Sequence, residues 1–455
     1  MSTKGLRQHW WPGQSIGLLI GPWLCICRAL TSGDRCSRTM PSSVSWGLLL
    51  LVGLCCLAPG SQVQDPQEAQ SSDHGHEHEE HSTCHNVSSR VIDMAFTLYR
   101  EPATWSRHSN ILFSPVSIAM AFAMLSLGTK GDTHTQILEG LKLNLRETPE
   151  AKIHECFQHL LQTFQQPSQQ RQLTTGSSLF IHSSLKLVDQ FVQDTKNLYH
   201  SAIVPVDFRN THEAKKQINS QVQQKTRRTV MGLVNHLEND TALALLNYIS
   251  FHGKWNEEPN AERHIVENFH VNRKMTIKVP MIHCLGNFFL HRDKELSSWV
   301  LVHHYLGDTT TFAILPDPGR MLQVEKKLTP KHFEDILRKI DIRTANLHFP
   351  KLSISGTIDL KPVLRSLGIT KVFSHEADLS GITEDAPLRL SQALHKAELS
   401  FDKEETVAAG DAKWEETTLF EAPTVQFNRP FLLIIRDEYT NFPLFGGKIV
   451  NPIEK

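Results

Sequence analysis

The sequence predicts an α+β fold in one large domain, because helical patterns dominate the first half of the body and strand patterns its last third. The chain has 455 residues, of which 40% are hydrophobic. That is enough apolar material for one large core or for two domains. No linker or internal repeat divides residues 88–455. Helices followed by antiparallel strands in one undivided segment are typical of the α+β class.

The periodicity of apolar residues supports each predicted element. Apolar side chains recur at helical spacing over residues 92–99 and 153–164. The segment 114–128 is apolar on nearly all sides, which predicts a helix buried in the middle of the molecule. Runs of strand type follow along the chain at 179–181, 248–251, 299–305 and 310–315.

The N-terminal region has the pattern of a targeting segment. Residues 45–58 form an apolar run of signal-peptide length, followed by the small residues Gly60 and Ser61. This run is shorter than the roughly 20 residues that span a bilayer. We therefore expect residues 40–63 to be a signal peptide starting at Met40, and residues 1–39 to be an upstream extension of doubtful expression. An uncleaved signal anchor is the alternative. Both interpretations direct the body of the chain to the secretory pathway.

Residues 64–87 are polar and rich in histidine, and they predict a disordered tail because they cannot bury enough apolar area. The spacing of their histidines matches no closed tetrahedral metal site, so neither a metal nor another cofactor is expected. Beyond the signal segment the cysteines are Cys84, Cys156 and Cys284. Three scattered thiols predict no disulfide framework, with Cys84 as an odd thiol able to form a mixed disulfide.

Other motifs narrow the class of function. Two acceptor sequons, at Asn86 and Asn239, suit a secreted glycoprotein. The chain has no nucleophile elbow, phosphate loop, dinucleotide fingerprint or zinc-protease motif, so it does not read as an enzyme. Its formal net charge of −1 does not favour nucleic acid or membrane surfaces as partners.

One loop, residues 406–420, suggests a function. It lies between two runs that read as buried strands, 394–401 and 425–435. Its first half consists mostly of small residues that a sheet could accommodate, and its second half offers Leu419 to an endoprotease. A loop that can be cleaved and can also become a strand indicates a protease trap.

Three segments together resemble the signature segments of the serpin family: 110–118 with its continuation to 141, 247–255, and 425–437 with 443–452. The resemblance implies a serpin domain over 88–455, with three β-sheets, eight or nine helices and an exposed reactive-centre loop at about 403–424. It also implies a mechanism in which a protease cleaves the loop. The loop then inserts into a sheet as an extra strand and drags the acylated protease with it.

The resemblance assigns roles to particular residues. Leu419 and Phe420 flank the reactive bond, and leucine suits the apolar pocket of chymotrypsin-like proteases. Elastase-like proteases are also expected targets, and trypsin-like proteases are disfavoured. A polar cluster below the sheet centre acts as a gate for strand opening, and Trp255 lies at the top of that sheet. The residues matched to the cluster are Ser114, Ser117, Asn219 and His395.

The hinge of the loop departs from the family pattern. Side chains alternate faces along a strand, so Thr406, Ala408, Gly410 and Ala412 would point inward and are easily buried. Glu405 replaces a customary glycine, and Lys403 replaces a customary glutamate near Arg320. These changes predict slower trapping and some self-insertion between molecules. The hinge as a whole comprises Lys403, Glu405, Thr406, Val407, Ala408, Ala409, Gly410, Asp411 and Ala412.

The leading hypothesis is therefore a secreted, extracellular inhibitor of chymotrypsin-like or elastase-like serine proteases, monomeric but able to form loop–sheet polymers. The alternative is a non-inhibitory serpin, either a carrier protein or a paralogue retained in the endoplasmic reticulum. The irregular hinge at Glu405 and Val407 favours this alternative.

Overall fold

The structure is a computed structural model that describes most of the chain after residue 72. The chain divides into two units, residues 1–70 and 71–455, and all described residues belong to the second. The described residues are 73–166, 171–226, 230, 232–238, 240–254, 263–305, 308–385, 387–402 and 422–454.

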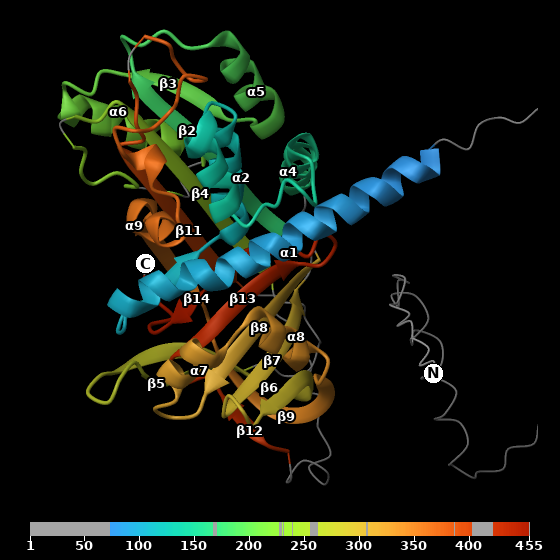
Figure 1. The fold of residues 1–455 in the computed structure, drawn as a ribbon. Helices are drawn as coiled ribbons and strands as arrows, with labels where there is room; N and C mark the ends of the chain where they lie inside the picture. The colour runs from blue at the N-terminus through green and yellow to red at the C-terminus, as the bar shows by residue number, and fades with distance from the viewer. Residues whose placement is uncertain are drawn as a thin grey trace, which may run out of the picture. The chain divides into compact units, whose positions relative to one another are not determined.

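Nine α-helices occur within these described ranges, and the first of them is by far the longest. They are α1 (Asp73–Trp105), α2 (Pro115–Ser126), α3 (Gly131–Gly140), α4 (Glu150–Gln165), α5 (Asp189–Tyr199), α6 (Thr211–Lys225), α7 (Met321–Lys327), α8 (Pro330–Leu337) and α9 (Leu360–Ser366), with a short 3₁₀ turn at Lys371–Phe373. In Figure 1, α1 runs between the five-stranded sheet and the strands of the other sheet against which α7 and α8 pack.

The five-stranded sheet has the order β10-β11-β4-β2-β3. Neighbouring strands are antiparallel except for two parallel pairs, β11 with β4 and β2 with β3. The strands are β2 (Arg171–His182), β3 (Ala202–Val206), β4 (Leu243–Lys254), β10 (Ser353–Asp359) and β11 (Gln392–Asp402).

The other strands form one nine-stranded sheet of order β1-β14-β13-β8-β7-β6-β9-β12, with β5 paired to β6. The 18-residue β6 pairs with β5, with β9 and with β7 along its length. The resemblance implied three sheets, whereas the described strands are hydrogen-bonded into two. The strands are β1 (Ile111–Phe113), β5 (Arg263–His270), β6 (Thr276–Asp293), β7 (Ser298–Tyr305), β8 (Thr309–Pro316), β9 (Asp341–Pro350), β12 (Thr424–Gln426), β13 (Phe431–Asp437) and β14 (Pro443–Ile449). The predicted α+β class is confirmed.

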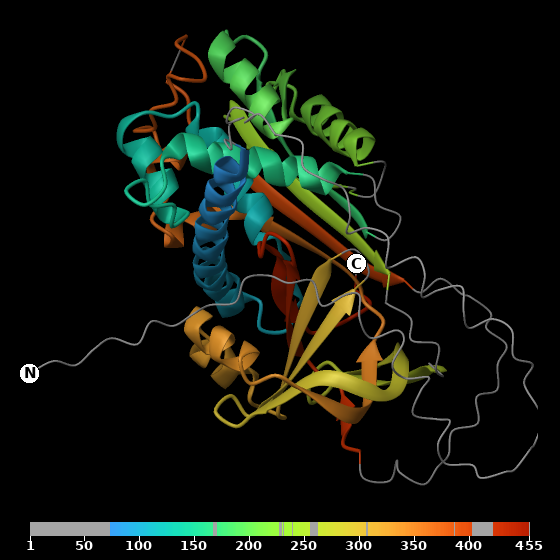
Figure 2. The same ribbon diagram turned by 90° about the vertical axis from the view of Figure 1, so that its right-hand side faces the viewer.

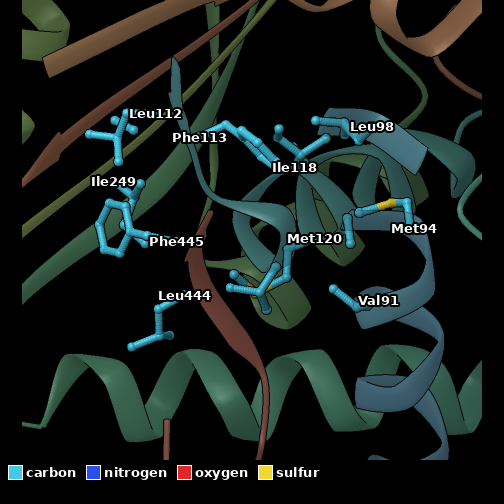
Figure 3. Packing of buried hydrophobic residues seen from close by; sticks show 14 of the residues in the cluster. Val91, Met94, Leu98, Leu112, Phe113, Ile118, Met120, Ile249, Leu444 and Phe445 are labelled. Atoms are coloured by element: carbon cyan, nitrogen blue, oxygen red, sulfur yellow. The ribbon is translucent and has the colours of Figure 1, made fainter. Parts of the chain in front are cut away.

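The largest core lies around α2, as the apolar segment 114–128 predicted. All twelve residues of α2 are buried. Figure 3 shows Ile118 and Met120 of this helix beside Leu98 and Met94 of α1, with Phe113 of β1 close by. Smaller clusters lie under α6 on the five-stranded sheet and under α7 and α8 on the nine-stranded sheet.

The prediction of a disordered tail was wrong for residues 73–87. Helix α1 begins at Asp73, Val87 is buried, and a disulfide joins Cys84 to Cys156 of α4 with a Cα–Cα distance of 5.4 Å. The prediction that Cys84 is the odd thiol was therefore also wrong. Composition describes what a segment can bury alone, whereas this segment continues a helix that packs against α4. Residues 64–72 lie outside the described ranges.

Within the described ranges, no helix has both the length and the apolar character that a membrane span requires.

Candidate functional site at the centre of the five-stranded sheet

The functional loop is attached to β11, and β11 is paired with β4 over its whole length. Gln392 lies opposite Ala244 and Asp402 opposite Lys254, with the strands parallel throughout. Figure 2 shows the two strands side by side, with their C-terminal ends at the same end of the sheet. No strand separates β11 from β4, so the sheet is closed at the place where an inserted loop would have to enter.

A central polar cluster, formed by Ser114, Ser117, Asn247 and His395, lies across this pair of strands. His395 of β11 and Asn247 of β4 are direct register partners, with His395 Nδ1 2.6 Å from Asn247 Oδ1. Nδ2 of Asn247 donates to Ser117 Oγ at 2.8 Å. All four side chains are buried, with at most 1% of each exposed. In an apolar interior such groups are retained only when they bond to one another.

The start of α2 completes this cluster. Ser114 is the N-cap residue of the helix, and its hydroxyl accepts from the backbone N–H of Ser117 at 3.2 Å. The backbone N–H of Ser114 donates to His395 Nε2 at 2.9 Å. This nitrogen must therefore be unprotonated, so Nδ1 carries the hydrogen that is donated to Asn247. Complete burial lowers the pKa of His395 from 6.5 to about 3, which keeps the ring neutral.

The hydrogen bonds continue into a third strand. Nδ2 of Asn247 also approaches Ser177 Oγ at 3.1 Å and the Gly176 carbonyl at 3.2 Å, both on β2. Ser117 Oγ lies 3.1 Å from Thr175 Oγ1, again on β2. The cluster thus ties β11, β4 and β2 to the buried helix. Separating β11 from β4 must break the shortest hydrogen bond of the cluster, the one between His395 and Asn247.

The expectation that Asn219 belongs to this cluster was wrong. Asn219 lies on α6, where its amide donates to the carbonyl of Val234 at 2.9 Å and accepts from the N–H of Val234 at 2.9 Å. It therefore fixes the backbone of the segment after α6. Asn247 occupies the expected place. The sequence contained a sign of this, because Asn247 interrupts an apolar face made by Leu245 and Ile249 on the same strand.

The expected contact of Lys403 with Arg320 stays a prediction, because Lys403 lies outside the described residues. Arg320 caps α7, and its guanidinium donates to Gln323. At the end of β11, the backbone N–H of Phe401 donates to the carbonyl of Leu352 at 3.1 Å, next to the register pair of Ser400 with Ser353.

Several predicted site residues lie outside the described ranges: Trp255, Asn239, the hinge 403–412, and the reactive pair Leu419 and Phe420. Asn86 of the first sequon is described and is exposed on α1. On the other side of the loop, β12 begins at Thr424 and pairs in parallel with β9 at Asn346. The loop is thus attached to the five-stranded sheet at one end and to the nine-stranded sheet at the other.

A closed sheet at the end of β11, with a buried polar cluster below, agrees with what the resemblance implied. The model of the serpin family, described as serine protease inhibitor, matches residues 89–452. The chain belongs to the serpin family.

Comparisons with individual proteins place it within that family. It is 59% identical over 421 residues to the alpha-1-antitrypsin-related protein of Homo sapiens, covering 91% of this chain and 100% of the relative. It is 51% identical to the alpha-1-antitrypsin of Sus scrofa, with the same two coverages. Among solved structures, human thyroxine-binding globulin superposes with a TM-score of 0.74 at 37% identity, covering 81% of this chain and 99% of that one. Human kallistatin gives a TM-score of 0.73 at 37% identity, covering 81% and 98%. Serpins are protease inhibitors and not enzymes, as the missing catalytic motifs predicted.

Proposed function

We propose that this protein is a secreted inhibitor of serine proteases that traps its target by inserting the cleaved loop between β11 and β4. The observation that carries the proposal is the closed parallel pair of these strands, held by His395 and Asn247, at the base of the loop. A sheet that is closed before cleavage can still gain a strand afterwards.

The topology supports insertion energetically. Because β11 and β4 run parallel, a strand that turns back from the end of β11 and enters between them would be antiparallel to both. One parallel ladder would be replaced by two antiparallel ladders, which are slightly more stable per residue. The chain from Lys403 to Leu419 is longer than the 11 residues of β11, so it can form a full strand. Cleavage beside Leu419 would release the constraint that keeps this segment out.

The loop sequence indicates the class of target. Leu419 before the reactive bond and Phe420 after it favour chymotrypsin-like proteases and also suit elastase-like ones. The hinge lowers the expected rate of trapping, because Glu405 stands where the family usually has glycine and Lys403 where it usually has glutamate. Two cations, Lys403 and the neighbouring Arg320 that the resemblance implies, would weaken the closed top of the sheet. Slow trapping and loop–sheet polymers are the expected consequences.

Secretion is supported by three separate features. The apolar run 45–58 has the length of a signal peptide. The disulfide between Cys84 and Cys156 suits an oxidising compartment, since such bonds are rare in the cytosol. Exposed Asn86 is a suitable acceptor for an N-linked glycan. We infer an extracellular glycoprotein, with retention in the endoplasmic reticulum as the alternative outcome.

The test is to incubate the purified protein with chymotrypsin and with elastase and to run a denaturing gel. A covalent complex that survives boiling is the expected result, and nicked protein should melt at a higher temperature than intact protein. Leu419→Arg is the matched variant, because it should move complex formation from these proteases to trypsin. Cleavage with neither a complex nor a gain in melting temperature would refute the inhibitory mechanism.

A carrier role is the second candidate, and one observation favours it. A structural neighbour is thyroxine-binding globulin in complex with thyroxine, and this chain has an apolar cavity between α1 and strands β13 and β14, lined by Phe96, Leu433 and Phe445 among others. Its volume of about 70 Å³ is well below the roughly 300–1,000 Å³ of pockets for such ligands. A carrier role would therefore require the cavity to open, and the inhibitor proposal is preferred.

A further inference from the structure

Three potential metal ligands converge on the nine-stranded sheet, away from the polar cluster described above. Glu267 of β5, His283 of β6 and His348 of β9 each offer one ligand atom, and these atoms all lie within 4.8 Å of one another. His283 and His348 are direct partners in the β6–β9 register, and their rings stack with centroids 3.8 Å apart. Sheet pairing therefore fixes the three side chains together, although they are far apart in the sequence.

The three side chains are largely shielded from solvent. Their exposed fractions are 9% for His348, 18% for His283 and 25% for Glu267. Nitrogen lone pairs and a carboxylate thus face one another in a partly dry site.

The hydrogen bonds available to these groups do not satisfy all of them. Nδ1 of His348 lies 3.3 Å from Glu267 Oε2 and 3.4 Å from Nε2 of Gln426 on β12. Nε2 of His283 is buried and makes no hydrogen bond among the described residues, although Oε1 of Glu267 lies 3.0 Å away. Such buried groups ordinarily have a partner. Two imidazoles and one carboxylate offer more acceptors than donors, and a cation would correct this excess.

We propose that Glu267, His283 and His348 bind a divalent transition-metal ion of the zinc type. Oε1 of Glu267 lies 3.0 Å from His283 Nε2 and 3.3 Å from His348 Nδ1. Ligands bound at about 2.0–2.1 Å in a tetrahedron are separated by about 3.3 Å. Both distances therefore suit one shared ion, with the stacked rings turning slightly apart to admit it.

The chemical types of the three ligands also indicate which metal ion the site would bind. Calcium and magnesium prefer sites made of oxygen ligands alone, whereas two imidazoles with one carboxylate suit zinc and its neighbours in the first transition row. Three protein ligands leave the fourth position for water. The sequence alone predicted no metal site, because no two of these ligands occur at a recognisable spacing.

Binding at this site would join β5, β6 and β9. Gln426, the last residue of β12, is the register partner of His348. The bound metal would thus stabilise the part of the sheet where β12, the strand after the reactive loop, pairs with β9. Since an ion that binds only the folded state stabilises it, zinc should raise the melting temperature of the intact protein.

The experiment must separate this site from the histidines of the N-terminal segment. We would use full-length protein in which His74, His76, His78 and His81 are replaced by alanine, and measure zinc bound at equilibrium by dialysis. One ion per molecule is expected. The same protein loaded with Co²⁺ should show the visible absorption of tetrahedral cobalt with nitrogen ligands.

Adding His348→Gln or Glu267→Gln to that protein should abolish both the bound ion and the rise in melting temperature with zinc. The matched control is His270→Gln, since His270 is an exposed histidine on the same strand as Glu267 and should leave binding unchanged. If the background protein binds no zinc and gives no tetrahedral cobalt spectrum, the proposal is overturned, whether or not the variants fold. Equal binding by the His348→Gln protein and its parent would overturn it as well.

Discussion

Replacing Asn247 by alanine tests whether the central polar cluster holds β11 to β4. The change removes the amide that accepts from His395 Nδ1 and donates to Ser117 and Ser177. Ser117 retains Thr175 as a partner, but the imidazole N–H of His395 remains fully buried with no acceptor. Each orphaned buried group costs about 1–3 kcal/mol, and the lost side-chain volume adds to this. We expect a loss of about 3–5 kcal/mol, a large share of the roughly 5–15 kcal/mol that stabilises a typical protein.

Urea unfolding at pH 7.5 would measure this loss, and native gels after mild heating would measure polymer formation. A weakened contact between β11 and β4 should increase polymers as well as lower stability. Asn219→Ala is the matched control, because it removes two hydrogen bonds between α6 and the backbone of Val234 in the segment that follows this helix. It should lower stability without promoting polymers. The reasoning fails if Asn219→Ala promotes polymers and Asn247→Ala does not, or if Asn247→Ala costs less than about 1 kcal/mol.

Three further predictions concern acid, the disulfide and the reactive bond. The pKa of His395 is about 3 in the folded protein, below its ordinary 6.5, so the unfolded chain takes up this proton first. The stability linked to His395 is complete above pH 6.5 and is lost as the pH falls toward 3, by about 2 kcal/mol at pH 5. The urea midpoints of wild type and of His395→Gln should therefore converge as the pH is lowered. Midpoints that keep a constant difference at every pH would contradict this. Cys156→Ser removes a disulfide between residues that are 72 apart in the sequence. The greater chain entropy of the unfolded state then lowers the free energy of unfolding by up to about 4 kcal/mol. A reductant should lower the melting temperature of wild type but not that of the variant. Leu419→Asp should abolish complexes with chymotrypsin while leaving the melting temperature of the intact protein unchanged, and persistence of the complex would show that the reactive bond lies elsewhere.

The sequence by itself determined the fold class and several helices and strands, and it supplied the hypothesis for the mechanism. The all-apolar segment 114–128 predicts a helix that is buried on every side, because no face of it can meet water. The resemblance to serpins assigned Ser114, Ser117 and His395 to one polar cluster, and the structure brings all three together. Leu419, in a stretch rich in small residues, indicates both cleavage and burial. These inferences depend on neighbours along the chain.

Only the tertiary structure decided which residues meet across the chain. Periodicity assigns a residue to a face of a strand but not to a partner, and so Asn219 was chosen where Asn247 lies opposite His395. The pairing of Cys84 with Cys156 depends on the packing of α1 against α4. The meeting of Glu267, His283 and His348 depends on the register of three strands. Each of these contacts is set by the geometry of packed helices and paired strands, and nothing in the local sequence specifies that geometry.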